Sequence, residues 1–374
     1  MQHLVSLYGI FSPEPLKLAL GNGHHGIVRL LCEAIECGDS LVWAAENGRL
    51  EAIKPIHEYH EDEETPYFYE AVLTAVSAGN LPIVQFVNSQ FGEELYGLYG
   101  GRAVGGCPLT RAIEDGKAEI AKYLVENNGY NASMFEMAFS AAATYGPLKI
   151  VELMQSDERS DASLRKKGFG LAAGGGLSEV MEFFRSKGDF ATSVVREAFL
   201  RAAGCGQTRI LKQLYADQAH EILAVIDEAA LTASGGGHLE VVKFFDNKGH
   251  VAEELVVKMF ECAATDEGLK DVSIIDDQTG VLAYLHSKGW ISVEIMNEVF
   301  PKAASCSCVE AVEFLLTTGP IFLEVAEDAF EEAAWDNCTV VEYFCKTRAV
   351  CPELIEIRGS RREKRYLLGR DSVQ

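Results

Sequence analysis

Few residues of this 374-residue chain stand at the spacings that chemistry requires. Residues 21–26, GNGHHG, match the Gly-x-Gly-x-x-Gly fingerprint of dinucleotide binding, which functions only between a strand and a helix. The preceding LKLAL has a helical pattern, so we interpret Gly23 as a turn residue instead. No Gly-x-x-x-x-Gly-Lys-Ser/Thr and no Gly-x-Ser-x-Gly sequence occurs. The motifs therefore indicate neither nucleotide binding nor serine hydrolase chemistry.

Two short clusters have metal-ligand character. His57 and His60 stand at helical i, i+3 spacing in the acidic HEYHEDEE, and Cys306 and Cys308 lie close together in a predicted turn. A structural zinc site requires four ligands in a set geometry, and neither cluster supplies them. We interpret the first as a solvated helix end and the second as reduced thiols. The sequence predicts no catalytic residue, no metal and no cofactor, and hence a protein that is not an enzyme.

Composition narrows the class of protein further. A hydrophobic fraction of 48% and a charged fraction of 24% are typical of a folded chain. The formal net charge of −23 would repel the phosphates of DNA or RNA, so we expect no nucleic acid on the body of the protein. No apolar stretch approaches the ~20 residues of a membrane span. Because no Lys or Arg precedes the first apolar residues, we expect an intracellular, cytoplasmic protein without a secretory signal.

A phrase of about thirty residues recurs along the chain. AAENGRLEAI, AVSAGNLPIV, AIEDGKAEIA and ASGGGHLEVV share an alanine four residues before a glycine. The marker alanines stand at positions 19, 44, 75, 112, 142, 172, 202, 233, 263, 303 and 333. Seven of the ten steps between them are 30 or 31 residues, which indicates a repeat array.

Each repeat has the same pattern of apolar residues. An amphipathic run precedes the alanine, a glycine ends it, and a second run with i, i+3, i+4 spacing follows, as in LEVVKFFDNKG from Leu239. The unit is therefore predicted to be helix, tight turn, helix, short link. One such pair cannot bury its own apolar face, but stacked pairs can. The sequence predicts an all-α fold, a solenoid of about 10–11 helical hairpins.

The repeat resembles the ankyrin repeat, in the divergent form expanded in oomycetes, protists and giant viruses. The residues from Cys107, CPLTRAIEDGKAEIAKYLVENNG, follow the family pattern best. The Thr-Pro-Leu-His tetrapeptide is missing from the other units, and in this one only Pro108 and Leu109 match it; the period is 30 rather than 33. We therefore expect short or absent β-turn fingers. Another helical-pair solenoid, such as a tetratricopeptide array, is the alternative fold, although its 34-residue period and aromatic markers do not recur.

The repeats predict one domain and a tail. The ankyrin-like solenoid is expected over 1–350, with insertions near 92–106 and 266–280, and a basic tail or cap over 351–374. Residues 358–370, RGSRREKRYLLGR, carry a net charge of +5 and leave about −28 for the rest. The tail is predicted to pack as a cap on the acidic final repeats, or alternatively to act as a nuclear-import signal.

The resemblance also implies where a partner would bind. In ankyrin repeats the two residues before each turn glycine lie at the exposed end of the first helix. Carried onto this sequence, the candidate partner-binding residues are Thr144, Tyr145, Gly174, Gly175, Gly204, Cys205, Gly235, Gly236, Trp335 and Asp336. The three central glycine-rich turns suggest a glycine-floored channel for a partner peptide. The alternative is that these glycines only end helices.

The expected function follows from this architecture. The chain is predicted to be a non-catalytic scaffold for protein–protein interaction, presenting an extended concave acidic surface to a partner with a basic face. One alternative is an intracellular effector of a pathogen that binds host proteins. Another is a protein that binds a ligand or cofactor through its two insertions.

Overall fold

The described residues of the computed structural model are entirely helical, apart from turns and links. They comprise 14–32, 38–59, 65–99, 107–127, 132–265, 277–306, 308–336 and 338–347. Within these ranges lie 22 α-helices and one 3-10 helix, and no strand. The all-α prediction is confirmed for this part of the chain. Residues 21–26 join two helices, so GNGHHG lacks the strand that its dinucleotide-binding interpretation would need.

The chain divides into two compact units, which are described separately. Unit 1 contains residues 1–172 and 179–188, and unit 2 contains residues 173–178 and 189–374. The predicted tail, residues 351–374, lies outside the described residues, as do 100–106 and 266–276 of the two predicted insertions.

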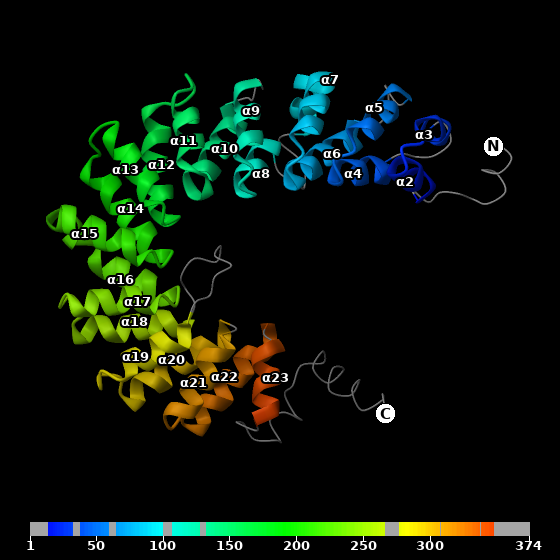
Figure 1. The fold of residues 1–374 in the computed structure, drawn as a ribbon. Helices are drawn as coiled ribbons and strands as arrows, with labels where there is room; N and C mark the ends of the chain where they lie inside the picture. Colours follow the sequence, from blue (N-terminus) through cyan, green and yellow to red (C-terminus); the bar gives the residue numbers. More distant parts are fainter. Residues whose placement is uncertain are drawn as a thin grey trace, which may run out of the picture. The chain divides into compact units, whose positions relative to one another are not determined.

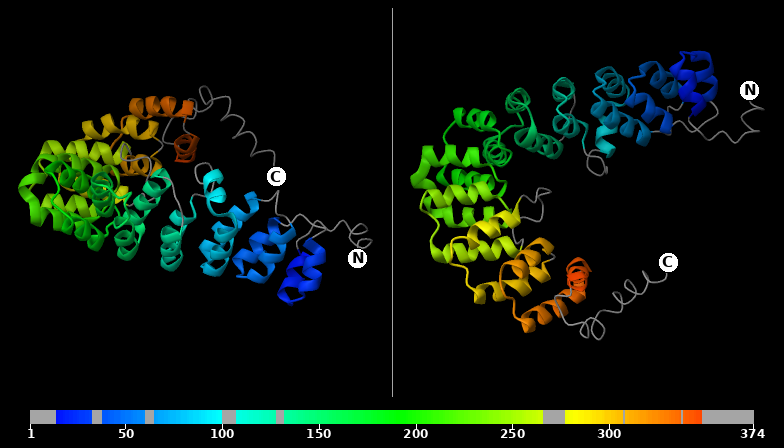
Figure 2. Two further views of the ribbon diagram at one scale, coloured as in Figure 1. Left: turned by 90° about the horizontal axis from the view of Figure 1, so that it is seen from above. Right: turned by 60° about the horizontal axis from the view of Figure 1, so that its bottom comes forward.

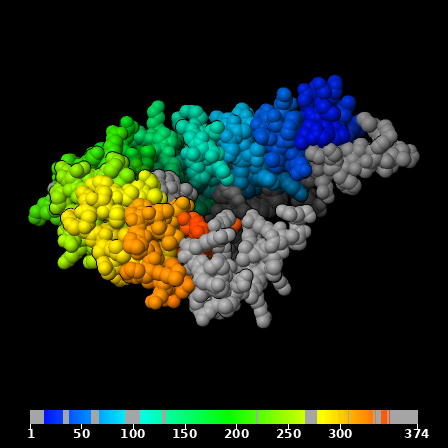
Figure 3. Space-filling model, turned by 90° about the horizontal axis from the view of Figure 1, so that it is seen from below, coloured from blue at the N-terminus to red at the C-terminus, as the bar shows by residue number. Residues whose placement is uncertain are grey.

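In unit 1 the helices form antiparallel pairs in two rows. α4, α6 and α8 contact one another in sequence, and so do α5, α7 and α9 (Figure 1). The helices of this region are α2 (Glu14–Gly21), α3 (His25–Cys32), α4 (Gly38–Glu46), α5 (Leu50–Tyr59), α6 (Thr65–Ala78), α7 (Leu81–Tyr99), α8 (Pro108–Glu114), α9 (Ala118–Asn127), α10 (Ala132–Tyr145), α11 (Leu148–Gln155), α12 (Ala162–Gly174) and α13 (Ser178–Ser186). In Figure 3 side chains fill the space that the ribbons leave between the blue pairs.

Unit 2 repeats the arrangement. Its first helices α14, α16, α18, α20 and α22 pack successively, as do α15, α17, α19, α21 and α23 (Figures 1 and 2). The helices are α14 (Thr192–Gly204), α15 (Thr208–Ile222), η1 (Leu223–Val225), α16 (Ile226–Gly235), α17 (Leu239–Asn247), α18 (Glu253–Thr265), α19 (Gln278–His286), α20 (Val293–Ser305), α21 (Val309–Thr318), α22 (Leu323–Asp336) and α23 (Cys338–Thr347). The links at 187–191, 248–252 and 319–322 contain no strand.

A periodic core holds the pairs together. The marker alanines are buried in every pair, where their small side chains allow close packing of helices. Three residues earlier each first helix carries another buried apolar residue. These residues are Leu16, Leu41, Val72, Leu109, Phe139, Phe169, Phe199, Ala230, Phe260, Phe300 and Phe330. The thirty-residue period in the sequence is therefore also a period of buried contacts.

The glycines that end the first helices adopt the left-handed conformation in six of these turns, and Gly146 is an exception. Gly48, Gly79, Gly116, Gly176, Gly206 and Gly237 have φ between 66° and 82°. Gly146 does not, because Pro147 follows it and a residue before proline is driven toward extended backbone. Gly319 likewise precedes Pro320 and has φ −144°. A following proline thus accompanies the two glycines that lack the left-handed conformation.

Candidate functional site

The predicted partner-binding residues fall into two chemically different settings. Thr144 and Tyr145 of unit 1 line a surface hollow of about 550 Å³, which we call the Tyr145 hollow. The glycine-rich sites of unit 2 lie in turns that other side chains cover. Trp335 and Asp336 end α22, but their side chains lie outside the described residues.

The Tyr145 hollow is built mainly by α10, between α8 and α12. Its lining residues are Thr110, Glu114, Ser133, Glu136, Met137, Ser140, Ala141, Thr144, Tyr145 and Lys167. α10 contributes the stripe Met137, Ala141, Thr144 and Tyr145, because residues four and seven or eight apart share a helix face. The predicted pair Thr144–Tyr145 therefore lies at one end of a continuous stripe along α10.

This face of α10 is more apolar than its sequence indicates. The Ser140 hydroxyl donates to the carbonyl oxygen of Glu136 at 2.8 Å, and the Thr144 hydroxyl donates to that of Ser140 at 2.8 Å. Both hydroxyls are thus bonded to their own helix. Beside them, the side chain of Met137 is 50% exposed and that of Tyr145 is 67% exposed. Large exposed aromatic and thioether side chains of this kind are enriched where proteins bind partners.

Carboxylates border the hollow. Glu136 pairs with Lys167 of α12 at 2.8 Å, and both side chains are about half exposed. Glu114 of α8 makes no ion pair within the residues that the structure describes, and it faces the same hollow. An ion pair this exposed contributes little to stability, so the two groups are available to rearrange around a partner. The local balance of two carboxylates and one ammonium is acidic.

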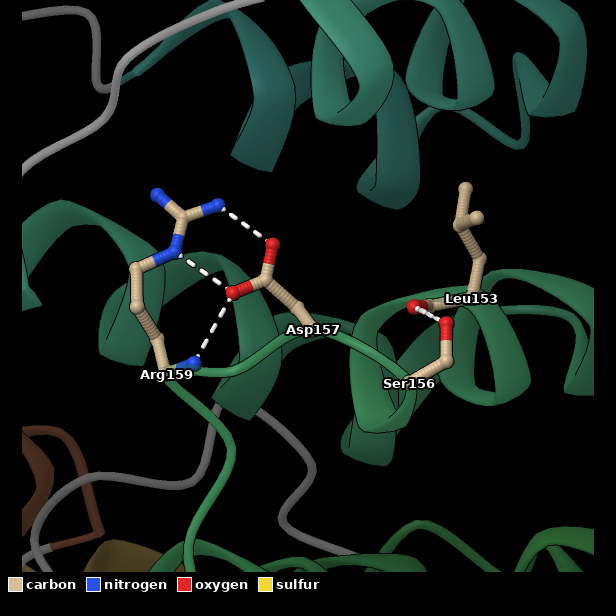
Figure 4. A network of polar contacts seen from close by, with 4 residues as sticks. All are labelled: Leu153, Ser156, Asp157 and Arg159. Atoms are coloured by element: carbon tan, nitrogen blue, oxygen red, sulfur yellow. Dashed lines mark hydrogen bonds and ion pairs between the residues drawn. The ribbon is translucent and has the colours of Figure 1, made fainter.

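An ion pair in the link after α11 packs against α10, the helix that forms most of the hollow. Arg159 donates from Nε and Nη2 to the two carboxylate oxygens of Asp157, each at 2.7 Å (Figure 4). The guanidinium also lies 4.2 Å from the ring centroid of Phe135 in α10. The hydrogen bonds from Arg159 lower the pKa of Asp157, so the carboxylate stays charged. The bidentate pair orients Arg159 within the link at 156–161, and the contact of its guanidinium with Phe135 ties that link to α10. Sequence reasoning missed it, although Asp157 and Arg159 stand two residues apart in a short link.

The glycine-rich turns of unit 2 are occupied by the following helix pair. His238 donates from Nε2 to the carbonyl oxygen of Gly204 at 2.8 Å, and the Gln278 amide donates to that of Gly235 at 3.3 Å. Asn80 makes the same bond in unit 1, to the carbonyl oxygen of Ala45 at 2.7 Å. In these three turns the residue after the turn glycine, or its counterpart, therefore reaches back to the end of the preceding first helix.

The room for a side chain differs between these glycines. A Cβ atom on Gly236 would stand 2.7 Å from His238 Nε2, and one on Gly174 would stand 3.5 Å from Cys205 Sγ. Gly204 and Gly235 are themselves buried. The structure thus provides a packing reason for glycine at Gly236, whereas the contact at Gly174 is an ordinary van der Waals distance. The glycine-floored channel stays a prediction.

No nucleophile is evident at these turns. Burial raises the pKa of the Cys205 thiol, and the opposing effect of nearby Arg201 is smaller. The thiol form is therefore favoured at neutral pH, and it is the thiolate that reacts. Among the described residues no group of three His, Cys, Asp or Glu side chains could hold a metal ion.

The structure places three of the four residues of the two metal-like clusters. The interpretation of His57 as part of a solvated helix end is wrong, because its half-buried ring lies 5.6 Å from Phe68 and 5.0 Å from Phe91. His60 lies outside the described residues. Cys306 is exposed, whereas Cys308 is buried at the start of α21.

No protein-family model matches the chain, and no curated protein matches it either. None of the described helices has the length and apolar character needed to cross a bilayer.

Proposed function

We propose that this chain is a non-catalytic scaffold for protein–protein interaction, built as an ankyrin-like stack of helix pairs. The all-helical pairs, their successive contacts and the periodic core support the stacking. The proposed surface is the concave, acidic one expected from the position of the first helices and from the net charge of −23. The proposed setting is the cytoplasm, with nuclear entry through residues 358–370 as an alternative.

The exposure of Met137 and Tyr145 on one stripe of α10 carries this proposal. A stacked pair can leave its outer surface polar, yet here two large apolar groups face solvent inside a hollow. A partner segment with an apolar side chain would cover them, and a Lys or Arg beside it would pair with Glu114. Such an arrangement has the apolar centre and charged rim of a typical interface.

The test is affinity capture from the source cells with the full chain as bait. We expect Met137→Asp combined with Tyr145→Asp to reduce retention of the bound protein by about tenfold or more, because buried aromatic anchors contribute about 2 kcal/mol or more. The matched control is Leu223→Asp, a charge placed on a 52% exposed apolar residue of unit 2. Mass spectrometry quantifies each captured protein.

Both variants should retain the melting temperature of the wild type, since exposed substitutions change stability by about 0.5 kcal/mol or less. Capture of the same proteins in equal amount by the wild type, the double variant and the control would remove α10 as the partner site.

A further inference from the structure

The first described helix pair has an uncovered edge. Ile27 stands four residues after its turn glycine and is 40% exposed. At the equivalent position in seven later pairs the side chain is at most 3% exposed. These residues are Ala52, Ile83, Ile120, Ile150, Val180, Ile210 and Val241. The same apolar position is therefore core in each of those pairs and surface only in the first.

Helix geometry shows which neighbour is absent. Ile27 and Leu30 are three residues apart and share one face of α3, and Leu30 is 49% exposed. Val28 and Leu31 on the adjoining face are buried, as in the other pairs. α2 and α3 lie at the edge of unit 1, with α4 and α5 on one side (Figures 1 and 2). The exposed face is thus the one that a preceding element would cover.

We propose that the segment directly before α2, residues 4–11 (LVSLYGIF), covers this edge as an apolar cap. Leu4, Leu7 and Phe11 recur at spacings of three and four, which places them on one helix face. As a helix the segment would span about 12 Å, the same length as the eight-residue α3. Residues 1–13 contain no Asp, Glu, Lys or Arg, so no charged group would be desolvated.

The cap also satisfies a general requirement of stacked repeats. A terminal repeat with an apolar outer face is prone to associate, and repeat arrays therefore end in a unit whose outer side is polar. Gln2 and Ser6 stand opposite the Leu4–Leu7–Phe11 face on the same helical projection and would form that polar side. The inference concerns the edge of α3 and is independent of the partner site on α10.

Hydrogen exchange of the full chain tests the cap. We expect Leu4→Asp combined with Leu7→Asp to raise the exchange rates of the α2 and α3 amides at least tenfold, because the edge then opens to water. The control, Gln2→Asp combined with Ser6→Asp, adds the same charge to the opposite face and should change these rates less than twofold. Amides of α16 in unit 2 serve as the internal reference.

A third variant, Ile27→Asp, should reproduce the effect of the Leu4 and Leu7 changes from the other side of the contact. Unchanged exchange in the Leu4/Leu7 variant would overturn the proposal. A second result would also overturn it. In that case the protection of the α3 amides from exchange would rise with protein concentration, and light scattering would show a dimer that Ile27→Asp dissociates. That result would assign the edge to a second copy of the chain.

Discussion

The end of the first helix α10 in unit 1 is an open surface, whereas the ends of the first helices α14 and α16 in unit 2 are covered. α10 ends in Thr144 and Tyr145, whose side chains line a hollow. α14 and α16 end in glycines whose carbonyl groups accept hydrogen bonds from His238 and Gln278. The counterpart of His238 in the pair after α10 and α11 is Leu177, which has no side-chain donor. The same repeat position is therefore open to solvent in one pair and covered in others, and the residue at the counterpart of His238 differs between them.

Among the substitutions that test this comparison, the largest loss of stability is expected at a covered turn. Gly206 has φ +68°, and a Cβ there would stand 2.7 Å from His238 Nδ1. Gly206→Ala should lower the free energy of unfolding by about 2–3 kcal/mol, from backbone strain and the clash together.

Gly116→Ala is the matched control, since Gly116 has φ +66° but nothing within 4 Å of its Cβ position. Strain alone should cost about 1 kcal/mol there. Urea unfolding curves measure both values. Equal losses would mean that His238 does not restrict the turn.

Removing the covering side chain should have a somewhat smaller effect. His238→Ala leaves the buried Gly204 carbonyl without its donor, which should cost about 1–2 kcal/mol. Lys117→Ala is the control, because Lys117 lies 3.8 Å from the Cβ position of Gly79, so that it covers a turn mainly by contact. It should change thermal stability by less than about 0.5 kcal/mol. A neutral His238→Ala would show that the turn is held by packing alone.

The smallest effect is expected for the ion pair between Asp246 of α17 and Lys288, which follows α19 in the next helix pair of unit 2. Burial disfavours the charged form of Asp246, but hydrogen bonds from Lys288 and Tyr284 outweigh it and lower the pKa of the carboxyl. A lowered pKa stabilises the fold above the ordinary value near 4, and this stabilisation is lost as pH falls through the folded-state pKa.

Asp246→Asn should therefore destabilise the protein at pH 7 and have a weaker effect near pH 3, measured as melting temperatures across that range. Glu136→Gln, at the half-exposed pair with Lys167 in unit 1, is the control and should show little pH dependence. A constant difference at all pH values would exclude charge as the origin of the Asp246 contribution.

The residue types before a helix indicate its start in some places and not in others. Ser292 is the N-cap of α20 as its position indicates, accepting from the Ile295 amide. At the start of α14 the N-cap is Ala191, although Ser193, a residue type that often caps helices, stands two residues later. A cap depends on the backbone angles of a single residue, and flanking residues such as Thr192 can start the helix earlier.

By itself the sequence determined the repeat, the helix pairs and the left-handed glycines, because period, apolar spacing and glycine content act over a few residues. The sequence also predicted Thr144 and Tyr145 as candidate partner-binding residues. Only the tertiary structure decided that Tyr145 lines a hollow, whereas the carbonyl group of Gly204 accepts a hydrogen bond from His238. It likewise decided that Ile27 is exposed where Ile83 is buried. Burial depends on which neighbour is stacked against a position, and that neighbour lies about thirty residues away in the chain.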